Sequence, residues 1–142
     1  MIRYLIDSSA LWRIMREPGV RAAWGEVIAD GAIGSCQPQR AEFRRSARNL
    51  DEYERMSGMF DDLYADAPVP KSAWRWIEAA QHRLVRSGQH RALSVADLLI
   101  AATAVHHRLV LVHDDGDFTA AARCLDDLVV QPVREAPAPV SG

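Results

Sequence analysis

The sequence contains acidic residues that stand where predicted strands end or predicted helices begin. They are Asp7, Glu42, Asp97, Asp114, Asp115 and Asp117. Carboxylates about 4 Å apart repel by roughly 4 kcal/mol per pair at an effective dielectric constant near 20. A group of them therefore either binds protons, with raised pKa values, or recruits a hard cation. With oxygen ligands and no nearby cysteine or paired histidine, Mg²⁺ or Mn²⁺ is favoured over zinc. The chemistry that these residue types predict is metal-assisted hydrolysis, for example of a phosphodiester.

Two apolar runs end at these acids. Ile2–Ile6 stops at Asp7, and "RLVLVH" (108–113) runs into "DDGDF". Because the apolar residues run together rather than alternate, both segments are typical of strands that are buried on both faces of a parallel sheet. Ligands of such sheets bind beyond the carboxyl ends of the strands. We therefore expect the two acidic segments to meet at one edge of the sheet.

The remaining elements follow from helical periodicity and from turn residues. The predicted helices cover Ser8 to the break at 17–19, 20–29, 37 to about 49, 53–64, 74–85, 94–106 and 117–124, and further strands cover 31–36 and 128–133. Alternating strands and helices predict an α/β fold with a central parallel sheet covered on both sides. We expect one domain over residues 1–134 and a disordered tail, rich in Pro and Ala, over 135–142.

The composition excludes several classes of protein. A chain of 142 residues with 49% hydrophobic residues is the size of one ordinary domain. Two distant cysteines without a Cys-x-x-Cys pair predict neither a disulfide framework nor a zinc site, so we expect a cytoplasmic protein. There is no basic segment followed by a long apolar stretch at the N-terminus, and no apolar run approaches the roughly 18 residues of a membrane span. The net charge of −2 argues against indiscriminate binding to polyanions and leaves a local basic patch open.

Each acid also has an ordinary structural explanation. Asp7 precedes a helix as an N-cap would, and Ser94 with Asp97 matches a capping box. Glu42 lies in a first helical turn, where a negative charge is favourable, and Asp114 belongs to a stretch typical of a turn. These explanations do not account for the acids together. Three of the acids begin helices that we expect to point at one sheet edge, and the end of a strand supplies the fourth.

Four segments that carry these acids resemble a known family. "YLIDSSAL", "QPQRAEF", "LSVADLLIAATAV" and "LVLVHDDGDF" are similar, in order and spacing, to the four acidic motifs of PIN-domain proteins. The resemblance is in particular to the VapC-like ribonuclease toxins of bacterial toxin–antitoxin modules, and it runs from residue 2 to about residue 133. It implies a three-layer α/β/α sandwich, Mg²⁺ or Mn²⁺ as cofactor, RNA as substrate, a small antitoxin protein as partner, and a homodimer.

The resemblance also assigns roles to residues. The four acids of the family fall on Asp7, Glu42, Asp97 and Asp115, and Asp117 matches a further acid. Ser9 matches a small polar position that supports the first acid. Many members have a threonine where His113 stands and a basic or polar residue at Asp114, which leaves open which acid of this segment contacts metal. Our hypothesis is that these acids hold one or two divalent ions and that a metal-bound water cleaves RNA.

Other functions compete with this hypothesis. A phosphoacceptor receiver domain needs a lysine after a late strand, and the only lysine is Lys71 in mid-chain. A haloacid-dehalogenase-like phosphatase needs a second aspartate where Ser9 stands. The remaining alternative is a non-catalytic PIN-like module that binds RNA or a partner protein without cutting.

Three further predictions concern binding surfaces. Arg40, Arg44 and Arg48 recur every four residues, which predicts either a stripe of phosphate contacts beside Glu42 or a solvated helical face. His113, at a strand end, is placed to hydrogen-bond a carboxylate or a phosphate. The resemblance suggests that the apolar residues of the first helix, Leu11, Trp12, Ile14 and Met15, partly line a groove for an antitoxin helix, although core packing would produce the same pattern.

Overall fold

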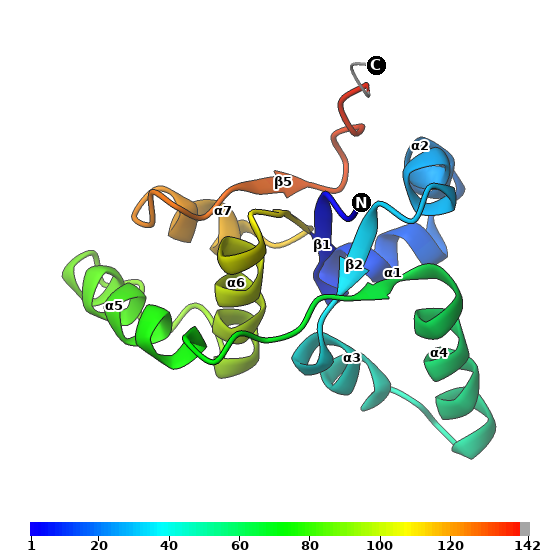
Figure 1. The fold of residues 1–142 in the computed structure, drawn as a ribbon, viewed down its shortest axis with the longest axis horizontal. Helices are drawn as coiled ribbons and strands as arrows, with labels where there is room; N and C mark the ends of the chain where they lie inside the picture. The colour runs from blue at the N-terminus through cyan, green and yellow to red at the C-terminus, as the bar shows by residue number, and fades with distance from the viewer. Residues whose placement is uncertain (140–142) are drawn as a thin grey trace.

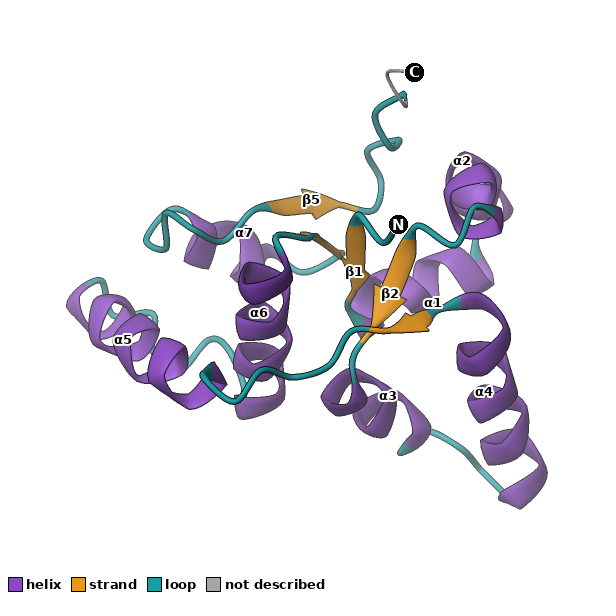
Figure 2. Ribbon diagram, in the orientation of Figure 1, coloured by secondary structure: helices purple, strands orange, loops and turns teal. Residues whose placement is uncertain are grey.

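The computed structural model describes residues 1–139, which form a five-stranded parallel sheet with helices on both sides (Figures 1 and 2). The strands lie in the order β3-β2-β1-β4-β5. Their bounds are Tyr4–Ile6 (β1), Ile33–Ser35 (β2), Ala65–Asp66 (β3), Val110–His113 (β4) and Val130–Pro132 (β5). In the centre of the sheet Leu5 lies opposite Gly34 on one side and Leu111 on the other. β1 and β4 are therefore neighbours, and their carboxyl ends open at the same edge.

Seven helices complete the described part of the chain. They are α1 (Ser8–Arg16), α2 (Pro18–Ala29), α3 (Gln37–Arg44), α4 (Leu50–Leu63), α5 (Ala73–Arg86), α6 (Val95–His107) and α7 (Gly116–Ala122). The apolar side chains of α5, α6 and α7 pack in one hydrophobic cluster, and those of α1 to α4 pack in a second. The fold is a three-layer α/β/α sandwich, as predicted.

The two central strands contribute to both clusters. Leu5 and Leu111 belong to the cluster under α5, α6 and α7, whereas Ile6 and Val112 belong to the cluster under α1 to α4. All four side chains are 0% exposed. The prediction that these strands are buried on both faces is confirmed, because successive side chains of a strand point to opposite faces.

The structure corrects the predicted helix over residues 37–49. α3 ends at Arg44, and α4 begins at Leu50. Asn49 is the N-cap of α4: its backbone is extended, and its side chain accepts the N–H of Glu52 at 2.8 Å. An extended residue cannot continue a helix, so the cap of α4 separates the two helices and leaves Arg48 outside both.

Smaller differences concern other elements. The second helix begins at Pro18 rather than at residue 20, because proline suits a first helical turn. β3 was not predicted, since two residues are too short to show a period. Residues 136–139 form neither helix nor strand, and the rest of the predicted tail, 140–142, lies outside the described residues. Within residues 1–139 no helix is long and apolar enough to cross a membrane.

A buried tryptophan ties α2 to the last strand. Trp24 is 0% exposed, its Nε1–H donates to the carbonyl oxygen of Val133 at 2.8 Å, and its ring meets that of Tyr4 edge to face at 5.2 Å. We expect Trp24→Phe to lower the free energy of unfolding by about 2 kcal/mol, because the carbonyl loses its donor and a small cavity remains. The measurement is urea denaturation. Trp74→Phe, at a position that is 61% exposed, is the control and should change little; equal losses in the two variants would contradict this assignment.

Candidate metal centre

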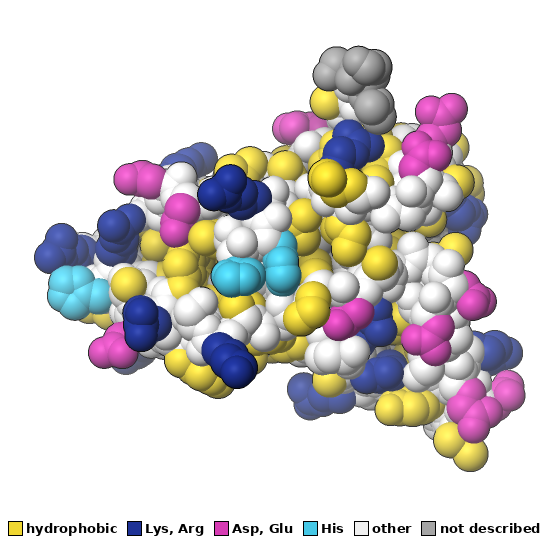
Figure 3. Space-filling model, in the orientation of Figure 1, with side chains coloured by type: hydrophobic (Ala, Val, Ile, Leu, Met, Phe, Trp, Pro, Cys, Tyr) yellow, Lys and Arg dark blue, Asp and Glu magenta, His cyan; other side chains and the backbone are white. Residues whose placement is uncertain are grey.

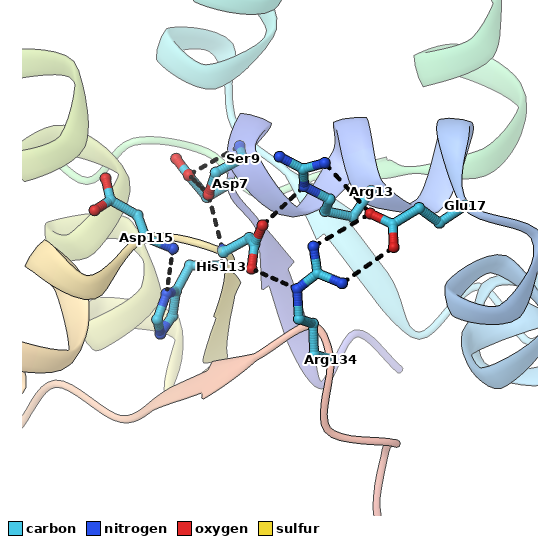
Figure 4. A network of polar contacts seen from close by, with 8 residues as sticks. Asp7, Ser9, Arg13, Glu17, His113, Asp115 and Arg134 are labelled. Atoms are coloured by element: carbon cyan, nitrogen blue, oxygen red, sulfur yellow. Dashed lines mark hydrogen bonds and ion pairs between the residues drawn. The ribbon is translucent and has the colours of Figure 1, made fainter.

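Asp7 occupies the junction between β1 and α1. Its backbone N–H donates to the carbonyl oxygen of Val112 at 2.9 Å, which ties it to the end of β4. Its Oδ2 accepts the backbone N–H of Ser9 at 3.1 Å and the Ser9 hydroxyl at 2.5 Å. Asp7 is therefore an N-cap, as its ordinary explanation predicts, and the cap fixes the orientation of the carboxylate (Figure 4).

Asp97 is also part of a helix cap. Its Oδ2 accepts the backbone N–H of Ser94 at 3.0 Å, and the Ser94 hydroxyl accepts the backbone N–H of Asp97 at 3.1 Å, which completes a capping box at the start of α6. A carboxylate has several acceptor positions on two oxygens, so the capping box leaves capacity for a further partner. Asp97 can therefore complete the capping box and bind a cation at the same time.

The fold brings three of the predicted acids together. Asp7, Glu42 and Asp97 each offer a carboxylate oxygen, and these oxygens all lie within 4.8 Å of one another. Asp7 comes from the end of β1, and Asp97 from the first turn of α6, which packs against α3. Glu42 comes from the second half of α3; its predicted place in a first helical turn is wrong, because α3 begins at Gln37. At this separation each pair of ionised carboxylates repels by roughly 3–4 kcal/mol at an effective dielectric constant near 20.

Burial and this repulsion shift the titration of two of the acids. Burial raises the pKa of Asp7, which is 4% exposed, against the opposing effect of the hydrogen bonds from Ser9. Burial also raises the pKa of Glu42, and the negative charges of Asp97 and Asp7 raise it further. Both carboxylates are thus held where the charged form is unfavourable unless a cation is near.

The unpartnered oxygen of Asp7 tests whether a cation fits. Oδ1 of Asp7 is buried and has no hydrogen-bond partner among the described residues. A buried carboxylate oxygen without a donor is costly, and a bound cation would remove that cost. Three converging carboxylates supply the hard oxygen ligands that Mg²⁺ and Mn²⁺ prefer. The residues present fit a divalent cation of this kind.

The acids after β4 lie outside this group. Asp115 is the N-cap of α7, and its Oδ1 accepts the backbone N–H of Asp117 at 2.9 Å. Neither residue belongs to the set whose oxygens lie within 4.8 Å of one another in the described chain. Figure 4 shows the Asp115 carboxylate at the same edge of the sheet as Asp7. The predicted metal contacts of Asp115 and Asp117 stay predictions.

His113 is buried at the end of β4 and is 1% exposed. Its Nδ1 accepts the backbone N–H of Asp115 at 3.1 Å, which assigns the ring proton of the neutral imidazole to Nε2. Burial lowers the pKa of His113, against the charge of Asp115, and Nε2 has no partner in the described chain. The structure shows no hydrogen bond from His113 to a carboxylate among the described residues, because its Nδ1 accepts from the backbone of Asp115. The other alternative, a hydrogen bond to a phosphate, stays a prediction.

The predicted stripe of arginines is wrong. Arg40 is 7% exposed; its guanidinium donates to the hydroxyl of Ser35 and to the carbonyl of Tyr64, each at 2.7 Å. Arg44 is half-buried, with its guanidinium 5.4 Å from the centre of a tyrosine ring. Arg48 lies beyond the end of α3 and pairs with the carboxylate of α4 residue Glu52 at 3.0 Å. The three side chains therefore do not form one stripe on a helix, and their contacts with RNA stay a prediction.

The apolar residues of α1 divide between core and groove. Leu11 and Ile14 are 0% and 4% exposed and belong to the core, so they do not line a groove. Trp12 and Met15 line a groove of about 700 Å³ that also includes Arg16, Met56 and Met59. The guanidinium of Arg16 lies 4.3 Å from the centre of the Trp12 ring. Two of the four residues therefore line a groove, and the binding of an antitoxin helix there stays a prediction.

Several contacts around the site escaped the sequence. Arg13 and Arg134 both pair with Asp114, and Arg134 comes from the segment after β5, far away in sequence from α1. The exposed Arg45 lies three residues after Glu42, and its charge opposes the rise in the pKa of Glu42. Only the folded strands bring Arg134 to Asp114, so no local pattern marks that pair.

The buried charge of Asp7 predicts a pH-dependent penalty. In metal-free protein the folded-state pKa of Asp7 is raised, so folding favours its protonated form. The penalty is absent below the ordinary pKa of 3.8 and is complete once the pH has passed the raised value. In EDTA, Asp7→Asn should therefore gain stability over wild type as the pH rises from 4 to 7. A gain of 1 kcal/mol corresponds to about 2–4 °C in melting temperature.

Thermal unfolding between pH 4 and pH 7 checks this. Asp62→Asn, an exposed change on α4, is the control and should follow the wild type at every pH. Mn²⁺ should raise the melting temperature of the wild type and not that of Asp7→Asn. An Asp7→Asn variant less stable than wild type at pH 7 without metal would show that the carboxylate is not strained.

Comparison with known proteins agrees with this geometry. The family described as "PIN domain" matches residues 4–123. "Ribonuclease VapC6" of Mycobacterium tuberculosis is 60% identical over 105 residues, which are 74% of this chain and 83% of that protein. "Ribonuclease VapC21" of the same species is 32% identical over 120 residues, 84% of this chain and 86% of that protein.

Solved structures share the fold. A VapBC2 complex of Rickettsia felis bound to a promoter DNA fragment superposes with a TM-score of 0.73 at 16% identity, over 93% of this chain and 98% of that one. VapBC-5 of Mycobacterium tuberculosis, described as a member of a family of toxin-antitoxin systems, gives 0.59 at 22% identity, over 93% and 98%.

Proposed function

The chain belongs to the PIN-domain family, and from that premise we propose that it is a metal-dependent endoribonuclease, the toxin of a toxin–antitoxin pair. The observation that carries the proposal is the group formed by Asp7, Glu42 and Asp97, with oxygens within 4.8 Å and one buried oxygen unpartnered. The two curated relatives described above are both named ribonucleases.

The proposed mechanism assigns a task to each element of the site. Asp7, Glu42 and Asp97 hold one or two divalent cations, Mg²⁺ or Mn²⁺. A bound cation supplies a water of lowered pKa and stabilises the charge that develops on the phosphate oxygens. Ser9 keeps Asp7 in a single orientation through two hydrogen bonds to Oδ2. Asp115, held by its own cap and by His113, lies at the same sheet edge, where it would contact the substrate or a second cation.

The acid group distinguishes this function from that of a binding module. A protein that only binds RNA gains nothing from three converging carboxylates, which repel a polyanion as well as one another. Two of them also belong to helix caps, but Glu42 makes no hydrogen bond with its carboxylate in the described chain, and the charges of Asp7 and Asp97 raise its pKa. Capping does not explain why Glu42 lies there.

The partners follow from the relatives. The similar structures are toxin–antitoxin complexes, and we propose an antitoxin protein as the partner of this chain. The groove lined by Trp12, Met15, Met56 and Met59 suits the apolar face of a helix. A cytoplasmic location and a homodimer are part of the proposal, because RNA and the antitoxin would be met there and because the family resemblance implies a dimer.

A cleavage assay tests the proposed function. Purified protein, freed of antitoxin, is incubated with a labelled total-RNA pool in Mg²⁺, Mn²⁺ or EDTA. We expect discrete cuts that require metal and a loss of at least about 100-fold in rate for Asp7→Asn and Asp97→Asn, since metal stabilisation amounts to several kcal/mol. Asp62→Asn is the matched control and should cut at the wild-type rate. Cutting by Asp7→Asn at the wild-type rate, or in EDTA, would refute the assignment.

The exposed arginines of α5 have fewer acidic partners than the arginines of the predicted stripe, so they are freer to contact RNA. Figure 3 shows Lys and Arg side chains gathered over α5. Arg75, Arg83 and Arg86 are exposed, and none forms an ion pair with a carboxylate in residues 1–139. Arg40 and Arg48, by contrast, both have acidic partners. Unpaired guanidinium groups remain free for phosphate.

RNA binding to the inactive Asp7→Asn protein tests this surface. Adding Arg75→Gln and Arg86→Gln should weaken binding to single-stranded RNA and reduce the slope of log affinity against log salt by about 0.7 for each phosphate that the protein no longer neutralises. Arg44→Gln with Arg48→Gln should change the slope less, because these side chains are packed or paired. A larger loss of slope in the Arg44→Gln and Arg48→Gln variant than in the α5 variant would instead assign the RNA contacts to the arginines beside Glu42.

A further inference from the structure

Four charged side chains form a network beside the candidate metal centre. They are Arg13 of α1, Glu17 at its C-cap, Asp114 after β4, and Arg134 after β5 (Figure 4). Arg13 Nε donates to Asp114 Oδ2 at 2.8 Å, and Arg134 Nε lies 3.3 Å from Asp114 Oδ1. Arg134 also donates to both oxygens of Glu17, at 3.0 and 3.2 Å. The network therefore joins three segments that are far apart in sequence.

The network reaches Asp7 through one serine. The backbone N–H of Asp114 donates to the hydroxyl oxygen of Ser9 at 2.9 Å, and the same hydroxyl donates to Asp7 Oδ2 at 2.5 Å. A hydroxyl has one proton. The Ser9 oxygen accepts from Asp114 with one of its two lone pairs, and its single proton is donated to Asp7. The position of the Asp114 backbone thus sets the donor that orients the first metal ligand.

This network of ion pairs is expected to contribute little to the free energy of unfolding. The side chains of Arg13, Glu17 and Arg134 are 41%, 36% and 52% exposed. Exposed ion pairs contribute between nothing and about 1 kcal/mol, because water and salt screen them. Each Asp114 oxygen contacts one guanidinium group, and Asp114 is not among the acids whose oxygens lie within 4.8 Å of one another in the described residues. What the network does fix is the position of the turn that carries Asp114 against α1.

We propose that Arg134 and Asp114 are positioning residues. Arg134 holds the segment after β5 against the turn that carries Asp114. This turn holds Ser9, and through Ser9 the Asp7 carboxylate, in the geometry that binds metal. This inference rests on the proposed metal-dependent function. Residues that hold a metal ligand in place typically change metal affinity by 10- to 100-fold when they are replaced. The C-terminal segment is then part of the metal centre although it supplies no ligand.

Calorimetric titration of the full chain with Mn²⁺ tests the proposal. Arg134→Gln and Asp114→Asn should each weaken Mn²⁺ binding by about tenfold. Arg123→Gln is the matched control, since Arg123 is exposed and outside the ion pairs of the described residues, and should bind as the wild type does. Circular dichroism and thermal unfolding show whether each variant is folded, and Arg134→Lys, which keeps the charge, should recover part of the affinity.

A double variant separates positioning from a purely structural role. If Arg134 acts through Ser9, Ser9→Ala with Arg134→Gln should bind Mn²⁺ no more weakly than Ser9→Ala alone. The proposal would be overturned if the losses of Mn²⁺ affinity in the two single variants added in the double variant. It would also be overturned if Arg134→Gln lowered the stability and left the Mn²⁺ affinity at the wild-type value. If wild type cleaves RNA and binds Mn²⁺ while Arg134→Gln does the same, only the positioning role fails. If wild type binds no Mn²⁺, the metal centre fails and this inference with it.

Discussion

Mutual repulsion of three carboxylates is the constraint around which this molecule is organised. The oxygens of Asp7, Glu42 and Asp97 are within 4.8 Å of one another, and burial together with the neighbouring negative charges raises the pKa of Asp7 and of Glu42. The rest of the fold must hold them there against that repulsion. It does so with a buried strand, a helix packed on a helix and two helix caps. A site held by such elements can bind a cation without first reorganising.

The caps have two roles in this arrangement. The bonds from Ser9 satisfy the N-terminus of α1 and orient Asp7, and the capping box of α6 does the same for Asp97. The N-terminal ends of these helices add partial positive charge, which eases the approach of carboxylates. The helix caps and the candidate metal centre therefore share side chains, and a structural explanation of an acid here does not remove a functional one.

The sequence was sufficient for the parts of the fold that depend on local pattern. Continuous apolar runs identified β1 and β4, and their acids identified the sheet edge, because strand burial and strand ends leave a direct trace in residue type. The extent of α3 was predicted wrongly, since a four-residue spacing continues through a turn as readily as through a helix. Arg40 is the clearest example: its spacing indicated a surface, and its burial depends on Ser35 and Tyr64, which local pattern does not connect to it. Arg134 escaped notice because its partner Glu17 lies 117 residues earlier in the chain.

The position of a bound cation is the most direct test of whether Asp7, Glu42 and Asp97 form a metal centre. Crystals of the protein soaked in Mn²⁺, with anomalous diffraction measured at the manganese edge, would show where the ion binds. We expect a manganese peak with oxygen ligands from Asp7, Glu42 and Asp97. The same data from Asp7→Asn crystals should lack that peak. A manganese peak elsewhere, or none at saturating Mn²⁺ in wild-type crystals, would contradict the assignment of this sheet edge as the metal centre.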